Sequence, residues 1–377
     1  DEGEPYNKLK LDQSIAKLKS RNLFSTVEKT IKSGSSSDLK EIDITVEEKP
    51  TGEISAGAGL GTNGGTFAFD IKENNWLGKG MEISTFLDVS RDTIKGQIGV
   101  TDPNYKFSGN SLSYHVSSTS NDKPKSGYEN SIISTGIATG FEQYKDIYFR
   151  PSLQLTMDDL TVTKDASDSL KKQSGSFTDL TFDYRLRQDK RDRAFKPTDG
   201  YVSSFRQSLP VVADAPYIKN SISLSGYNSF GQDIIGAVKF YAASITGLER
   251  EDVRISKRIK IPYTRLRGFE SGNFGPIDGN EYVGGNYASA VNFEASLPNL
   301  LPEATKTDLG MFLDFGNIWG VDYDSSVSEA STVRSTVGAN IGWTSPVGPM
   351  SFVISQNLNK AKTDRTESFN FRLGTTF

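Results

Sequence analysis

The chain has 377 residues, of which 35% are hydrophobic, 11% are aromatic and 24% are charged, and its formal net charge is −4. No run approaches the roughly 18 consecutive apolar residues of a transmembrane helix, which excludes a helical membrane protein. The near balance of acidic and basic residues argues against nucleic acid as a partner, and the absence of cysteine removes disulfides and Cys-ligated metals. A transmembrane β-barrel remains open, because its strands alternate and give a weak hydropathy signal.

Residues 1–50 differ in pattern from the rest of the chain. Apolar residues at helical spacing predict a helix over residues 8–21. Two short strands are expected at residues 27–31 and 42–46, joined by a turn rich in serine and glycine. Because a helix and one hairpin cannot bury a full core alone, we expect this segment to be an incomplete α/β domain. A chain that opens at Asp1 without a signal peptide is expected to be a processed form or a fragment.

From residue 51 onward, apolar and polar residues alternate in segments of about nine to thirteen residues, the length at which a tilted strand crosses a bilayer. Sixteen strands are predicted, at residues 54–60, 67–71, 83–89, 94–100, 112–116, 132–140, 147–160, 177–187, 201–209, 217–227, 236–248, 287–297, 307–319, 332–343, 348–356 and 367–377. An even number brings both ends of a barrel to the same side. The sequence therefore predicts an all-β membrane protein, in which a 16-stranded antiparallel transmembrane β-barrel over residues 51–377 follows the partial α/β domain.

The expected connections are of two kinds. Tight-turn residues occur at 74–75, 102–104, 197–200 and 345–349. The connections at residues 164–174 and 250–284 are long, and we find no convincing amphipathic helix after residue 51. Short turns on one rim and long loops on the other are typical of outer-membrane barrels. A soluble solenoid or sandwich is the alternative, which is disfavoured because soluble strands average only about five to six residues.

The long glycine-rich loop contains Arg267, Gly268 and Phe269 in succession. An arginine guanidinium forks onto carboxylates with a geometry that lysine cannot match. Gly268 has no Cβ to block a close approach, and Phe269 can fill an apolar gap. Glu294 and Asp314 lie in the two strands that follow, and both point away from the apolar face, because successive strand side chains alternate. We predict a loop tethered inside a closed structure, and parity leaves open whether Arg267 pairs with Glu294, Asp314 or both. An unrelated loop arginine that faces solvent is the alternative.

The first and last predicted strands must pair to close the barrel, and both carry glycine, which weakens a strand. A weak seam can open and expose strand edges that recruit an incoming strand. The residues assigned to this lateral gate are Ile54, Ala56, Gly57, Ala58 and Gly59 in the first strand, and Phe371, Leu373, Gly374 and Phe377 in the last. We expect Ala56 and Leu373 to lie near each other across the seam. The alternative is that the glycines only accommodate curvature or a crowded lumen.

The final strand ends in an aromatic residue, Phe377, after alternating apolar residues, a pattern typical of the sorting signal of outer-membrane barrels. An ordinary last strand is the alternative. Enzyme activity is not expected, because the single histidine, His115, falls on a polar strand face with no nucleophile motif or metal-spaced partner nearby. We therefore expect no catalytic residues, no metal and no cofactor.

Several motifs in order along the chain resemble the BamA family of outer-membrane protein assembly factors. They lie at residues 75–80, 101–105, 191–200, 266–269, 283–286, 314–319 and 343–349. The resemblance covers essentially the whole chain, as the last POTRA domain without its first strand and first helix, followed by a sixteen-stranded barrel. Leu266 stands where the family commonly has valine. The resemblance implies that Arg267 belongs to the sixth extracellular loop, which folds into the lumen and pairs with Glu294 and Asp314.

The resemblance also implies a function. It implies an insertase in the bacterial outer membrane, with the POTRA part in the periplasm, that folds and inserts client barrels through the lateral gate. The implied partners are unfolded β-barrel clients, membrane lipids and accessory lipoproteins, including a BamD-like one, at the POTRA domain. A TamA-like or two-partner-secretion transporter has the same barrel and is the alternative, distinguished by the number of POTRA domains. A passive porin-type channel is a further alternative.

Overall fold

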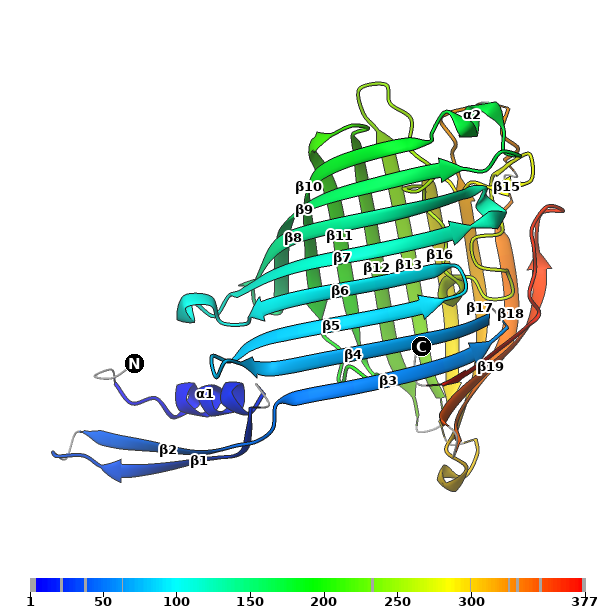
Figure 1. Cartoon of the computed structure of the whole chain (residues 1–377). Helices are drawn as coiled ribbons and strands as arrows, with labels where there is room; N and C mark the ends of the chain where they lie inside the picture. The colour runs from blue at the N-terminus through cyan, green and yellow to red at the C-terminus, as the bar shows by residue number, and fades with distance from the viewer. Residues whose placement is uncertain are drawn as a thin grey trace.

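The computed structural model describes residues 5–20, 23–36, 39–62, 64–231, 234–298, 300–324, 326–329, 332–345 and 348–374. Its main body is a closed β-barrel in which each strand pairs antiparallel with its neighbours (Figure 1). The barrel strands are β3 (Gly52–Gly61), β4 (Gly64–Trp76), β5 (Met81–Ser90), β6 (Thr93–Asp102), β7 (Ser111–Lys123), β8 (Tyr128–Tyr144), β9 (Ile147–Val162), β10 (Gly175–Asp189), β11 (Gly200–Ala213), β12 (Tyr217–Phe230), β13 (Ile234–Gly247), β16 (Tyr287–Leu297), β17 (Thr307–Trp319), β18 (Arg334–Ser345), β19 (Gly348–Asn359) and β20 (Phe369–Gly374). The predicted fold class and the sixteen strands are confirmed.

Strand alternation builds the barrel wall, as the sequence predicted. Val238 of β13, Phe293 of β16 and Met311 of β17 are 50%, 45% and 57% exposed and form the apolar outer surface. The neighbouring positions Asn292 and Asp314 are buried toward the lumen. Because a barrel in a bilayer satisfies its backbone hydrogen bonds between strands and turns apolar side chains to the lipid, this arrangement is the inverse of a soluble barrel.

The N-terminal segment forms a separate small unit beyond the rim at which β3 begins (Figure 1). It consists of α1 (Lys8–Ser20) and a hairpin of β1 (Phe24–Ser33) and β2 (Lys40–Glu48). Apolar side chains of β2 such as Ile42 and Ile44 stay exposed, as expected where one helix and one hairpin must make a core. The boundary after residue 50 and the POTRA assignment remain predictions.

The two rims differ, although less cleanly than predicted. We call the rim at which β3 begins the N-terminal rim and the opposite one the distal rim. The predicted tight turns at residues 102–104 and 197–200 lie at the N-terminal rim. Residues 74–75 belong to the end of β4, and the turn follows them at residues 77–80. Of the turn predicted at 345–349, residues 346–347 lie outside the described residues. Both long loops follow strands that run toward the distal rim. The distal rim nevertheless also has tight connections, at residues 91–92 and 214–216, and the N-terminal rim has the longer connection 190–199. Loop length therefore marks a rim only for the longest loops.

The expectation of no helix after residue 51 needs a small correction. The distal loop after β9 contains the single turn α2 (Asp168–Lys171), whose first turn is capped by the hydroxyl of Ser167 accepting from the N–H of Leu170. Four residues are too few for the periodic pattern from which a helix is predicted. None of the helices in the described part of the chain is long and apolar enough to cross a membrane.

The connection 190–199 at the N-terminal rim is ordered by one carboxylate. Asp192 accepts hydrogen bonds from the backbone N–H of Thr198 at 2.9 Å, from its hydroxyl at 2.7 Å and from the N–H of Asp199 at 3.2 Å. These donors stabilise the charged form and lower the pKa of Asp192 to about 2. The Asp192 carboxylate thus stabilises the connection between β10 and β11.

Candidate functional site

The segment between β13 and β16, residues 248–286, folds into the barrel, and we call it the lumen loop. Ile261, Leu266 and Phe269 are fully buried in a cluster with Ile245 of β13 and Ile318 of β17. Two two-residue strands, β14 (Ile277–Asp278) and β15 (Glu281–Tyr282), form a small hairpin within the loop. They are not part of the barrel wall, in which β13 pairs directly with β16. The loop thereby carries its own apolar core into an otherwise polar lumen.

Arg267 meets both carboxylates that strand parity placed on the lumen face. Its guanidinium donates from Nε to Asp314 Oδ2 at 2.8 Å and from Nη2 to Asp314 Oδ1 at 2.7 Å. Nη2 also lies 3.0 Å from Glu294 Oε1. The backbone N–H of Arg267 donates to Asp314 as well, at 3.1 Å. The sequence left open whether Arg267 pairs with Glu294, Asp314 or both, and in the structure its guanidinium contacts both carboxylates.

Other side chains complete this anchor. Lys239 of β13 donates to Glu294 at 2.5 Å, so two cations balance two carboxylates. Asn292 donates to Asp314 at 2.8 Å, Phe312 stacks beneath the guanidinium at 3.7 Å, and Thr336 donates to the carbonyl of Arg267 at 2.7 Å. Burial of charge is costly unless partners and hydrogen bonds compensate it, and here they do. Sequence reasoning assigned none of these four supporting contacts, although parity already put Asn292 and Glu294 on one face.

Gly268 lies where the loop touches the wall most closely. Its φ of +84° is in the left-handed region, and a Cβ there would lie 2.4 Å from Thr336 Cγ2 and 2.9 Å from Ser355 Oγ. Phe269 next to it is fully buried and packs on Phe274 with ring centroids 5.4 Å apart. The Cβ-free approach and the apolar plug expected from the sequence are both seen in these contacts.

Gly268→Ala is expected to loosen the anchor and to lower the free energy of unfolding by about 1–3 kcal/mol, because it adds both backbone strain and a clash. Gly272→Ala is the matched control. Gly272 has a similar φ of +73°, but its added Cβ would meet only the Lys260 side chain, at 3.3 Å, which is a close contact and not a severe clash. Urea unfolding in micelles measures both variants. Equal losses would show that crowding against Thr336 contributes nothing.

The lumen loop is also bonded to the segment that leads into β20. Phe269 and Thr366 form an isolated antiparallel bridge. The N–H of Glu367 donates to the carbonyl of Gly268, and the N–H of Glu270 donates to the carbonyl of Arg365, each at 3.1 Å. The last strand of the barrel is therefore approached by a chain segment that pairs with the Arg267 loop.

The seam between β3 and β20 is the shortest strand pairing of the barrel among the described residues. It has three register pairs, Gly61 with Arg372, Leu60 with Leu373 and Gly59 with Gly374. On the other side of β20, β19 and β20 have five pairs. Gly61 can lie this close to β20 because it has no side chain. A Cβ added to it would lie 2.5 Å from the carbonyl oxygen of Phe371.

The predicted gate residues are only partly at this seam. The structure pairs Gly59 with Gly374, and it places Leu373 opposite Leu60. The expected proximity of Ala56 and Leu373 is wrong, because the register puts Leu60, four residues further along β3, across from Leu373. The other gate residues assigned to β3 have no partner in the described part of β20; they are Ile54, Ala56, Gly57 and Ala58. Phe377 lies outside the described residues.

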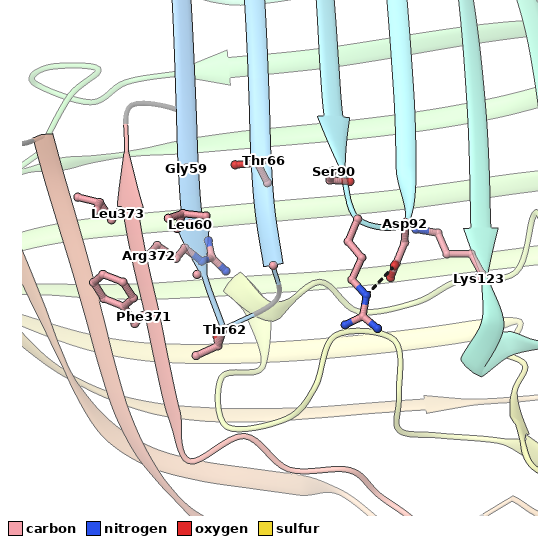
Figure 2. Close-up of a pocket in the computed structure, with 13 residues that line it drawn as sticks. Gly59, Leu60, Thr62, Thr66, Ser90, Asp92, Lys123, Phe371, Arg372 and Leu373 are labelled. Atoms are coloured by element: carbon pink, nitrogen blue, oxygen red, sulfur yellow. Dashed lines mark ion pairs between the residues drawn. The ribbon is translucent and has the colours of Figure 1, made fainter.

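A pocket of about 350 Å³ opens beside the seam. Figure 2 shows that β3 contributes Gly59 and Leu60 to it, and that β20 contributes Phe371, Arg372 and Leu373. Phe371 also packs toward β19, the other neighbour of β20, where its ring lies 5.1 Å from that of its register partner Phe352. The pocket thus adjoins the described register pairs of the seam and extends to Asp92 and Lys123.

The lumen loop has further anchors that sequence reasoning missed. Arg254 pairs with Asp179 of β10. Lys257 lies 3.5 Å from the same carboxylate and 3.7 Å from Asp158 of β9. Arg258 pairs with Asp322 after β17. The loop is thus fixed to several parts of the wall, and the only available signal was a concentration of basic residues in its first third.

Comparison with known proteins agrees with this geometry. Residues 75–377 match the model of the Omp85 superfamily domain. The outer membrane protein assembly factor BamA of Neisseria meningitidis is 25% identical over 435 residues, covering 100% of this chain and 53% of that protein. The chain spans about half the length of the curated relatives it matches first.

Solved structures give the same fold. The structure of BamA from Haemophilus ducreyi lacking POTRA domains 1–3 matches with a TM-score of 0.84 at 20% identity, covering 97% of this chain and 78% of that one. CdiB from Escherichia coli matches with a TM-score of 0.62 at 14% identity, covering 99% and 72%. The chain therefore belongs to the Omp85 superfamily, as a BamA-like protein of the bacterial outer membrane.

Proposed function

We propose that this chain is the barrel part of an insertase that folds and inserts β-barrel proteins into the outer membrane through a lateral gate between β3 and β20. The observation that carries the proposal is the seam, which has three register pairs over the described residues. Separating two strands costs hydrogen bonds in proportion to the pairs broken, so this is the point at which the closed wall opens most easily.

The edge of β3 provides the template. From Gly52 to Ala58, β3 pairs with β4 on one side and has no described partner in β20 on the other. An unpaired strand edge presents N–H and C=O groups that recruit another strand, and main-chain bonding accepts any sequence. This suits a protein whose clients share strand geometry rather than sequence. The client strand enters beside β3, and its side chains reach lipid through the gate.

The Arg267 anchor preserves the shape of the barrel while the seam moves. Its partners Asp314 and Glu294 belong to β17 and β16, which lie far from β3 in the strand order. The anchor therefore survives separation of the seam strands. The same loop is bonded at Thr366 and Glu367 to the approach of β20, so the moving strand stays attached to the fixed part of the lumen.

The N-terminal unit is proposed to be a POTRA remnant that receives unfolded clients and docks accessory lipoproteins, among them a BamD-like one. No nucleotide is available in the periplasm, so the free energy of insertion comes from the folding of the client and its burial in lipid. In this proposal the protein contributes a path for the client rather than covalent chemistry.

Two alternatives make different demands on the same barrel. A passive porin needs an open lumen, whereas the lumen loop lies across it, with Arg267 and Arg254 each ion-paired to the wall. A transporter of the TamA or two-partner-secretion type moves its substrate across the membrane instead of into it. The fold likeness to CdiB accommodates this second alternative.

Reconstitution separates these functions. The protein is incorporated into liposomes, and an unfolded client barrel is added with and without it. We expect the half-time of client folding to fall at least about tenfold, equivalent to about 1.4 kcal/mol of barrier. Folding is followed by the shifted gel mobility of unheated barrels. Unchanged folding, together with steady conductance or with release of an exported substrate into the lumen of the liposome, would replace the insertase with one of the alternatives.

A further inference from the structure

Three arginines form one row across the lumen wall between β9 and β11. Arg185 of β10 is the register partner of Arg150 in β9 and also of Arg206 in β11. Adjacent strands lie about 4.8 Å apart, so the three side chains leave the wall side by side. The charge of Arg185 is within electrostatic range of Arg150, Arg187 and Arg206.

The row has no ion-pair partner within the described part of the protein, although the Asp183 carboxylate lines the same pocket. None of Arg150, Arg185 and Arg206 forms an ion pair with a described carboxylate. They also donate no hydrogen bond to another described residue. The nearest acidic neighbour along the strand, Asp183, accepts from the Thr181 hydroxyl at 2.7 Å instead. Like charges directly opposite each other on neighbouring strands are destabilising, so the repulsion between these arginines lowers the stability of this part of the wall.

The arginines line two adjoining pockets of about 430 and 480 Å³ that share Arg206. Lys219 contributes to the first pocket. Arg265 of the lumen loop contributes to the second, where it stacks on Tyr241 at 4.1 Å and has no described carboxylate partner. A chain with a net charge of −4 thus concentrates, in one part of its lumen, cations that form no ion pair with a described carboxylate. Of these, Lys219 donates to the carbonyl of Lys257 at 3.0 Å.

The position of these pockets limits what can enter. Arg150 is the fourth residue of β9, and Arg185 is four residues from the end of β10, so both lie near the N-terminal rim. Pro262 and Arg265 of the lumen loop border the second pocket. The remaining lining includes Ser208 and Ser221, which are polar. A lipid with its acyl chains is unsuited to such a lining, whereas an extended polypeptide enters from the rim.

We propose that this arginine row is a binding site for an acidic polypeptide segment presented at the N-terminal rim. Each guanidinium offers a fork of donors that matches a carboxylate, and neighbouring forks can hold successive acidic side chains of an extended strand. The inference rests on the proposed function and deepens it, since the peptide belongs to a client that arrives from the side of the N-terminal unit. Binding itself is measured without any assembly step.

The test uses the full chain in micelles and a fluorescein-labelled peptide in which glutamate alternates with serine. A peptide with glutamine in place of glutamate is the probe control. Arg150→Gln combined with Arg206→Gln removes two charges of the row and breaks no described hydrogen bond. Lys72→Gln combined with Lys95→Gln removes two charges from another part of the lumen wall. The gel mobility of unheated samples verifies that all variants are folded.

We expect the glutamate peptide to bind, the glutamine peptide not to bind, and added salt to weaken binding. The arginine double variant should lose at least about tenfold in affinity, and the lysine double variant less than about twofold. Equal losses in both variants, or no binding of the glutamate peptide, would overturn the site. Tighter binding of inorganic tripolyphosphate or of a short-chain phosphatidic acid than of the peptide would overturn the polypeptide occupant. Peptide binding that persists in a protein unable to assemble clients would remove the proposed function and leave the site.

Discussion

Arg267→Ala is expected to cost the barrel about 3–5 kcal/mol of unfolding free energy and to abolish client assembly, because it breaks a buried ion pair and leaves one partner uncompensated. Asp314 is fully buried and loses the two hydrogen bonds from the Arg267 guanidinium, whereas the bond from the backbone N–H of residue 267 can persist with alanine. Urea unfolding in micelles and the liposome folding assay measure the two effects.

Two further variants identify the cause of that loss. Arg267→Lys keeps the charge but cannot reach both Asp314 oxygens and Glu294 with one planar fork, so assembly should stay impaired. Combining Arg267→Ala with Asp314→Asn removes the stranded charge and should recover part of the stability without recovering assembly. If Arg267→Ala leaves both stability and assembly unchanged, the anchor is not needed for the shape of the barrel.

A disulfide across the seam is expected to stop client assembly almost completely, and reduction is expected to restore it. Leu60→Cys and Leu373→Cys form the correct pair, because these residues are opposite each other in the register. Opposed Cβ atoms in antiparallel strands are about 4.5–5.5 Å apart, within reach of a disulfide after a small adjustment. The chain has no native cysteine to compete.

The matched control locks a different strand pair. Val238→Cys with Phe293→Cys joins β13 to β16 at an outward-facing register pair and should leave assembly unchanged. Ala56→Cys with Leu373→Cys separates the thiols by about four residues, roughly 13 Å along β3, and should not oxidise within one molecule. Full assembly by a seam-locked barrel would rule out the lateral gate and transfer the activity to the rim or to the N-terminal unit.

Alternation was enough to predict the barrel, since a period of two over sixteen segments has no other economical explanation. It also put Glu294 and Asp314 on the lumen face, because parity depends only on position along a strand. It could not give distances, because the contacts of Arg267 with Asp314, Glu294 and Thr336 depend on how a loop of almost forty residues folds back.

The register between β3 and β20 could not be predicted from the sequence for a different reason. The pairing of β20 with β3 is fixed by the stagger that accumulates around the whole barrel, not by the two strands themselves. Leu60 was therefore missed and Ala56 was chosen in its place. The arginine row was missed similarly, because Arg150, Arg185 and Arg206 become neighbours only once the register of three strands is known.

The hydrogen bonds between the lumen loop and residues 365–367 predict from which end the proposed gate opens. β20 descends from the distal rim, where Phe269 pairs with Thr366 and where Asn370 donates to the Thr62 hydroxyl at 2.7 Å. These contacts hold the distal end of β20 more firmly than its other end. In the proposed gate, we therefore expect separation of β20 from β3 to begin nearest the N-terminal rim and to proceed toward the distal rim. A client strand that arrives at the N-terminal rim would then meet the separated strands first.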